Sequence, residues 1–189
     1  MKRITKITLF ALAVAGLAVV AVLGLPAVMK AAGENTFDLD VACDCRTGAT
    51  LDGGVRGSPF IIQGKIFPAG TLPSGTAIND PTQPFNGVAP IGDWICRGQN
   101  SFPFPPAIAP SYSLTPKALN TQYFILNDGR ALTAEGYDVL PRGERLSVTG
   151  GIGSFRGASG DIGTLGFGTN VTGCPNFRAK FTFQPGSLR

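Results

Sequence analysis

The sequence predicts an all-β protein, a barrel or a sandwich of about eight short strands, preceded by an N-terminal signal or anchor helix. Three observations lead to this fold class. Short runs with period-two alternation recur along the chain, helical periodicity is absent beyond the first 33 residues, and 26 glycines and 15 prolines punctuate the runs. A hydrophobic content of 43% is too high for a disordered chain. We therefore expect one all-β domain over residues 34–189.

The first 33 residues have the pattern of a secretory leader. Lys2, Arg3 and Lys6 precede an uncharged apolar run that extends to Met29, and small residues follow at 31–33. The segment is either a cleaved signal peptide or an uncleaved membrane anchor, because the run is almost long enough to span a bilayer. Both alternatives place the domain outside the cytoplasm, as a secreted, periplasmic or cell-envelope protein.

The expected strands cover 36–46, 59–67, 91–98, 120–126, 130–139, 145–149, 155–169 (as one or two strands) and 176–184. Asn127-Asp128-Gly129 is typical of a hairpin turn, and Gly150-Gly151 is expected to form another. Proline-rich stretches at 68–90 and 99–116 are expected to be long surface loops. In the first strand, Asp38, Asp40 and Asp44 alternate with the cysteines. They could form a cation site, but the wet face of a strand explains them more simply.

Charge and composition exclude several functions. The formal charge of +4 comes from four basic residues of the leader, so 12 basic residues face 12 acidic ones in the domain. No basic run is present to follow a nucleic-acid backbone, and nucleic acid is not an expected partner. The chain has no histidine, which excludes Ser-His-Asp and Cys-His catalysis and His-ligated metal sites. No cofactor is expected, and contact with a membrane is expected only through an uncleaved leader.

Four cysteines in an exported chain favour two disulfides. Cys43 and Cys45 lie two apart on one strand and are poorly placed to bond each other. We therefore expect Cys96 and Cys174 to take one partner each, which would join the first strand to the third and the last. A metal site of four thiolates is the alternative, disfavoured by the spacing and by an oxidising compartment.

The run GGIGSFRGASG at 150–160 resembles the GGTG-x-[FY]-x-GA-x-G signature of the dirigent and allene oxide cyclase-like barrels. The segments 124–129, 132–136 and 92–98 are similar to strands of exported bacterial members of that superfamily. The resemblance implies an eight-stranded antiparallel barrel with an apolar interior cavity, often trimeric. In the plant relatives that cavity holds a phenoxy radical pair or an unsaturated fatty-acid epoxide. The plant catalytic carboxylates match no positions here, so those activities do not carry over.

The candidate site residues are few. Asp161, Glu135 and Tyr123 are weak catalytic candidates, and Arg156, Asp161, Trp94 and Tyr123 are candidates for ligand binding. Each also has a structural interpretation: a solvated carboxylate, a rim charge or a core aromatic.

Three functions remain open. The first is an envelope protein that binds a small apolar or aromatic molecule inside the barrel without a reaction of its own. The second is a dirigent- or cyclase-like template, which would not be a hydrolase. The third is a structural role for the proline-rich loops. A homo-oligomer, dimer or trimer, is expected.

Overall fold

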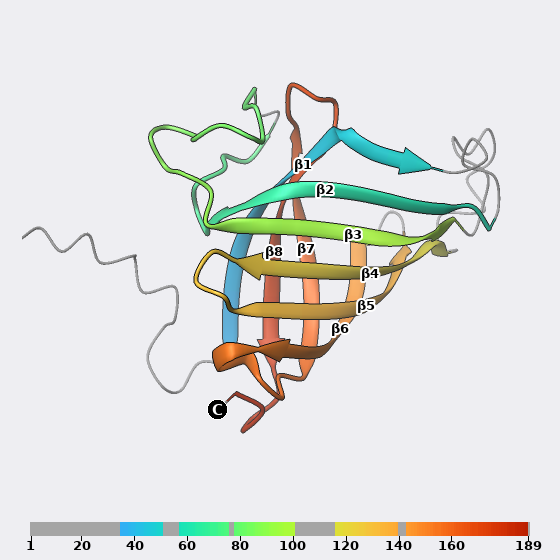
Figure 1. The fold of residues 1–189 in the computed structure, drawn as a ribbon, viewed down its shortest axis with the longest axis vertical. Helices are drawn as coiled ribbons and strands as arrows, with labels where there is room; N and C mark the ends of the chain where they lie inside the picture. The colour runs from blue at the N-terminus through green and yellow to red at the C-terminus, as the bar shows by residue number, and fades with distance from the viewer. Residues whose placement is uncertain (1–34, 51–56, 76–77, 101–115, 140–142, 189) are drawn as a thin grey trace, which may run out of the picture.

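The computed structural model describes residues 35–50, 57–75, 78–100, 116–139 and 143–188. The predicted leader and most of the second proline-rich loop lie outside these residues. Eight strands form one closed antiparallel barrel in sequence order, which confirms the barrel part of the predicted fold class (Figure 1). The strands are β1 (Thr36–Thr50), β2 (Pro59–Pro68), β3 (Gly92–Asn100), β4 (Pro116–Leu126), β5 (Ala131–Val139), β6 (Gly143–Ile152), β7 (Gly160–Thr169) and β8 (Pro175–Phe183).

Strand β1 closes the barrel by pairing with both of its neighbours. Residues 36–42 pair with β8, beginning at Thr36 opposite Thr182, and residues 39–50 pair with β2 across a shift in register between Asp44 and Ala49. The shift lets one strand bend from the β7–β8 side to the β2–β6 side. In Figure 1, β2–β6 form a layer that runs across β1, β7 and β8.

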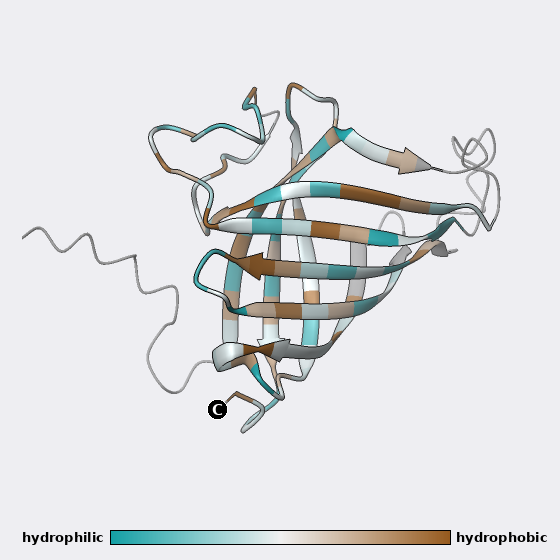
Figure 2. Cartoon of the chain, in the orientation of Figure 1, coloured by the Kyte–Doolittle hydropathy of each residue, from teal (hydrophilic) through white to brown (hydrophobic). Residues whose placement is uncertain are grey.

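The predicted hairpin between β4 and β5 is confirmed. Leu126 donates its backbone N–H to the carbonyl of Arg130 at 2.8 Å, and Gly129 takes a positive φ of 87°. This turn is hydrophilic, whereas the end of β4 that enters it is hydrophobic (Figure 2). Strand β4 begins earlier than predicted, at Pro116, because a proline is tolerated at the first position of a strand.

The prediction of a turn at Gly150-Gly151 is wrong, because β6 continues through both glycines to Ile152. The turn follows instead in the short 3-10 helix η3 (Gly153–Phe155), where Gly153 has a φ of 67°. A Cβ on Gly151 would lie 2.7 Å from the carbonyl oxygen of Ala131 on β5. The glycine therefore serves a close approach of two backbones and not a change of direction.

Aromatic rings fill the end of the barrel that η3 covers. Phe155 is 1% exposed, and its ring lies 5.4 Å from Phe37 and 6.2 Å from Phe183. Phe181, fully buried, packs edge-on against Phe124 at 5.0 Å. Side chains of this size contribute about 1.5–3 kcal/mol each when fully buried, so this cluster is a main source of stability.

The outer face of β1 is also buried, so the interpretation of its aspartates as the wet face of a strand is wrong. Asp40 is 0% exposed and Asp44 is 5% exposed. The loop after β2 folds over them, and its Leu72 packs in a second apolar cluster with Ala42, Phe67 and Phe167. The described part of this predicted surface loop is therefore a cover for β1.

One of the two predicted disulfides is confirmed. Cys45 and Cys174 are joined, with their Cα atoms 5.2 Å apart. The second, between Cys43 and Cys96, is absent, and both residues are buried in the barrel core. Cys43 lies opposite Gly64 and Cys96 opposite Ile62, so the whole of β2 separates them. Two strand spacings, about 9–10 Å, exceed the span of a disulfide.

Candidate functional site: an apolar groove on the outer face of the barrel

An apolar groove of about 870 Å³ lies on the outer face of the barrel, near the starts of β2 and β4 and the ends of β3 and β5. Its volume is within the range of small-molecule sites. Its lining comes from the end of β1 and from β2, β3, β4 and β5: Ala49, Pro59, Phe60, Ile61, Arg97, Gly98, Gln99, Leu119, Asn120, Thr121, Glu135, Gly136 and Tyr137.

The strand registers place this groove outside the barrel. Nine of the thirteen lining residues occupy the outward positions of two adjacent rows, one through Ile61, Arg97, Thr121 and Glu135, the other through Pro59, Gln99, Leu119 and Tyr137. The other four belong to the inward row between them. Ile62 and Gln122 belong to the next inward-facing row along the strands, and they do not line the groove. The groove therefore lies on the surface of the barrel and not in its interior, where the sequence analysis expected the ligand.

Glycine explains how the strands can approach so closely here. Gly98 lies in the floor of the groove, and a Cβ at this position would overlap the carbonyl oxygen of Leu119 on β4. Gly136 is also in the floor, on the other side of β4. Glycines at such points let strands bend in a small barrel.

The walls of the groove expose large apolar side chains to solvent. Leu119 is 58% exposed, Tyr137 is 44% exposed and Ile61 is 39% exposed. Single exposed apolar residues are ordinary on protein surfaces, but Leu119 and Tyr137 are paired neighbours in the same concavity as Ile61, and such a grouping marks a binding surface.

Two opposite charges flank the floor. Arg97 on β3 and Glu135 on β5 both pair with Thr121 on β4, so one strand separates them. The guanidinium of Arg97 lies 5.1 Å from the ring centre of Tyr123, a cation–π contact that restrains it. The backbones that carry the two charges are therefore about two strand spacings apart, roughly 9–10 Å.

Three of the five predicted site residues lie away from the groove. Trp94 is buried in the interior, where its Nε1 donates to Gln122 Oε1 at 2.9 Å and its ring meets Phe177. Arg156 is exposed in the turn after η3, beyond the end of β6 that pairs with the start of β5. Asp161 is exposed on β7, in the same row as Glu135 but two strands away.

The structure brings the other two predicted residues to the groove. Glu135 lines it, and Tyr123 borders it by supporting Arg97. Sequence reasoning missed Arg97 and Leu119. The alternation of β3 does place Arg97 outward with Asp93 and Ile95, but the sequence does not reveal that Thr121 and Glu135 are its neighbours in the row.

Beneath the floor, the side chain of Asn120 enters the barrel. Asn120 is 6% exposed, and its Oδ1 is buried without a hydrogen-bond partner. A buried acceptor without a partner is costly, and such atoms commonly contact an ordered water.

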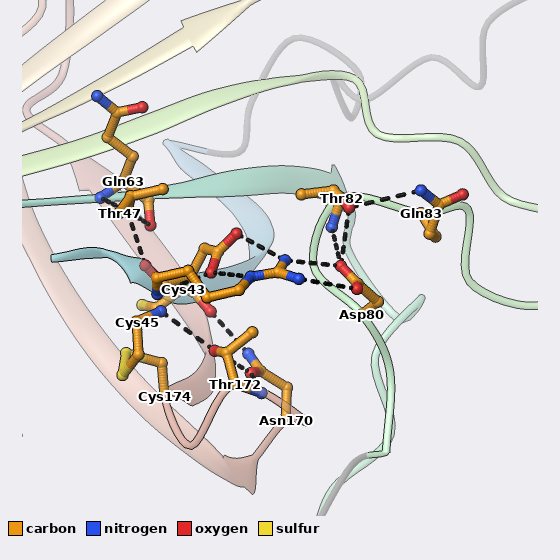
Figure 3. Close-up of polar contacts among 12 residues, drawn as sticks. Cys43, Cys45, Thr47, Gln63, Asp80, Thr82, Gln83, Asn170, Thr172 and Cys174 are labelled. Atoms are coloured by element: carbon orange, nitrogen blue, oxygen red, sulfur yellow. Dashed lines mark hydrogen bonds and ion pairs between the residues drawn. A yellow bond between two sulfur atoms is a disulfide. The ribbon is translucent and has the colours of Figure 1, made fainter.

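A second polar cluster fixes the loop after β2 to the barrel (Figure 3). Arg46 donates to Asp44 at 2.8 Å and to Asp80 on the loop at 2.9 Å. The hydrogen bonds that Arg46 donates lower the pKa of both carboxyl groups, and the same bonds raise the pKa of Arg46. Arg178 donates to the buried Asp40 at 2.7 Å, and this bond raises the pKa of Arg178.

The disulfide borders the same cluster. Cys45 donates its backbone N–H to Thr172 Oγ1 at 3.1 Å, and Asn170 Nδ2 donates to the carbonyl of Cys43 at 2.7 Å. These charges and amides bind one another, and we interpret the cluster as structural. The disulfide also rules out the four-thiolate metal site, since it consumes two of the thiolates.

Within the described ranges, no three or more Cys, Asp and Glu side chains gather in a way that could hold a metal ion. The same ranges contain no helix long and apolar enough to cross a membrane.

No protein-family profile matches the sequence, and no curated protein matches it. Solved structures do resemble it. A pyocyanin demethylase superposes with a TM-score of 0.51 at 14% identity, covering 79% of this chain and 99% of its own. The pterocarpan synthase dirigent protein GePTS1 gives 0.51 at 9% identity, over 77% and 84% of the two chains. The dirigent protein PsPTS1 gives 0.51 at 12% identity, over 80% and 96%. At such identities the likeness establishes the fold: the chain has the barrel of the dirigent proteins and of pyocyanin demethylase.

Proposed function

We propose that the protein binds a small, mainly apolar or aromatic molecule in the groove over β2–β5, without a reaction of its own. The observation that carries the proposal is the exposure of Leu119, Tyr137 and Ile61 around a glycine floor. Covering these side chains with a ligand would remove apolar surface from water, at roughly 25 cal/mol per Å².

The names of the structural neighbours agree with a small-molecule partner. One is a demethylase named for pyocyanin, and two are dirigent proteins named for pterocarpan synthesis. Pyocyanin is therefore a reasonable first compound to test, although the shared fold by itself assigns no ligand.

A template for a reaction is the second candidate function. The presence of Glu135 and Tyr137 in the groove favours it, because a carboxylate and a phenol can exchange protons with a bound molecule. An open groove nevertheless excludes water poorly. Turnover of a ligand that binds the groove, lost in Glu135→Gln, would favour the template.

We also propose export. The Cys45–Cys174 disulfide supports it, because disulfides persist in oxidising compartments. The charged and apolar N-terminal pattern supports it as well. Fractionation of the producing cells, with the N-terminal mass of the product, tests export and cleavage together.

Ligand binding is tested first by native mass spectrometry of the protein purified from its own cells. The spectrum reports the subunit number and any retained molecule. Titration calorimetry with that molecule, or with pyocyanin if none is retained, then compares two matched variants. Leu119→Gln should weaken binding by about tenfold, because it removes an apolar wall. Leu165→Gln should not, because Leu165 is a similarly exposed leucine on β7 outside the groove. Equal effects of the two variants would refute the groove as the binding site.

A further inference from the structure

Arg97 differs from three other arginines on or beside the described strands. Arg46, Arg130 and Arg178 each form an ion pair, with Asp44 and Asp80, Asp128, and Asp40, respectively. Arg97 forms none with any described residue, although it lies in the groove and its aromatic support holds it there. Stacking on Tyr123 uses the face of the guanidinium and leaves its N–H groups for another partner.

The register explains why Arg97 keeps its charge uncompensated. Its row partners are Ile61 and Thr121, and its outward neighbours along β3 are Ile95 and Gln99. All four are neutral. A guanidinium that is restrained, exposed and surrounded by neutral groups beside an apolar wall matches the geometry in which arginine binds a carboxylate bidentately.

Glu135 provides the complementary half of the pattern. Its row partners, Thr121 and Ser147, are also neutral, and it faces the same groove from β5. A carboxylate there would repel the anionic end of a ligand and would accept a hydrogen bond from a donor at the other end. The two charges therefore give the groove a direction, with the anion at β3 and the donor at β5.

We infer that the groove selects flat apolar molecules that carry a carboxylate at one end, bound by Arg97, and a hydrogen-bond donor at the other, received by Glu135. This inference rests on the proposed function and adds the chemical class of its ligand. The backbones that carry the two residues are about two strand spacings apart, so a ligand that meets both side chains lies across β4. Leu119 and Tyr137 lie in the adjacent row, where they can cover one face of such a body.

The test uses four probes of similar shape in titration calorimetry with the full-length protein: 6-hydroxy-2-naphthoate, 2-naphthoate, 2-naphthol and 2-methylnaphthalene. We expect 2-naphthoate to bind about tenfold more tightly than 2-naphthol, as one charge-assisted pair provides. The hydroxynaphthoate should bind more tightly still, and added salt should weaken both acids.

Variants locate the interactions. Arg97→Gln should reduce the affinity for 2-naphthoate about tenfold and leave 2-naphthol unchanged. The matched control is Arg156→Gln, which removes an exposed arginine far from the groove and should change neither. Glu135→Gln should remove most of the difference in affinity between the hydroxynaphthoate and 2-naphthoate.

The outcomes separate the two proposals. Binding of all four probes with equal affinity would overturn the inference and leave the proposed function in place. Binding of none of them to a folded protein would count against the proposed function itself. Loss of 2-naphthoate binding in Arg156→Gln but not in Arg97→Gln would overturn the inference by placing the anion elsewhere.

Discussion

Asp40 provides the sharpest test of how the barrel holds its covering loop. Its carboxylate is 0% exposed and accepts three bonds: from Arg178 Nε at 2.7 Å, from Arg178 Nη2 at 3.3 Å and from the backbone N–H of Leu72 at 2.9 Å. In Asp40→Asn, the side chain keeps one acceptor and turns an NH₂ group toward donors, so at least one bond is lost and Arg178 is left unpaired.

The expected cost follows from the burial of the two partners. Breaking a buried ion pair costs about 3–5 kcal/mol. The Arg178 side chain is 22% exposed and can recover some hydration, so we expect the lower end, about 3 kcal/mol. The matched control is Asp93→Asn, which breaks the ion pair of Asp93 with Lys65. The side chain of Asp93 is 55% exposed and that of Lys65 is 38% exposed, so this change should cost about 1 kcal/mol or less.

The free energy of unfolding is measured by urea titration, with the fluorescence of Trp94, the only tryptophan, as the signal. Hydrogen exchange at the Leu72 amide reports in parallel whether the loop opens. If Asp40→Asn lowers the free energy of unfolding no more than Asp93→Asn does, the reasoning is refuted. The attraction within the buried pair would then only offset the cost of its desolvation.

Three further predictions concern backbone packing, thiol chemistry and pH. Gly98→Ala should destabilise the barrel by about 3 kcal/mol in thermal or urea unfolding, because its Cβ would overlap β4, whereas Gly166→Ala should be nearly neutral, since nothing lies within 4 Å of its added Cβ. Alkylation in denaturant should modify two cysteines before reduction, Cys43 and Cys96, and four afterwards, as counted by intact mass; no modification before reduction would mean that a second disulfide exists. Arg46→Gln should lower stability at neutral pH, and the difference from wild type should vanish in acid. The folded-state pKa of each carboxyl group that it contacts lies below the ordinary 3.8, so the stabilisation is full above that value and is lost as pH falls below it; a pH-independent difference would contradict this.

Much of the fold could be predicted because it depends on local patterns. The alternation along each strand and the Asn127-Asp128-Gly129 turn are both encoded within a few residues. The glycine block indicated the barrel, but the role of each glycine was not local. Gly151 approaches β5 and Gly153 makes the turn, and only the paired strands distinguish these two uses.

The groove and the burial of β1 could not be predicted, because both depend on segments far apart in the sequence. Asp40 has the pattern of a solvent-facing residue until Leu72 and Arg178 cover it. Arg97 and Glu135 are separated by 38 positions in the numbering but meet the same residue of β4. Alternation indicated which side of a strand each residue occupies, and only the register indicated its neighbours.

The pairing of β1 with β8 has a consequence for how the protein is made. The first strand to emerge during synthesis finds one of its two partners only when the last strand has appeared, and the disulfide joins residues 129 positions apart. A nascent chain that contains β1–β7 therefore has two unpaired sheet edges and an open aromatic core. Such high contact order slows folding and leaves this intermediate prone to aggregation, so the chain depends on reaching its final strand before a neighbouring chain supplies one.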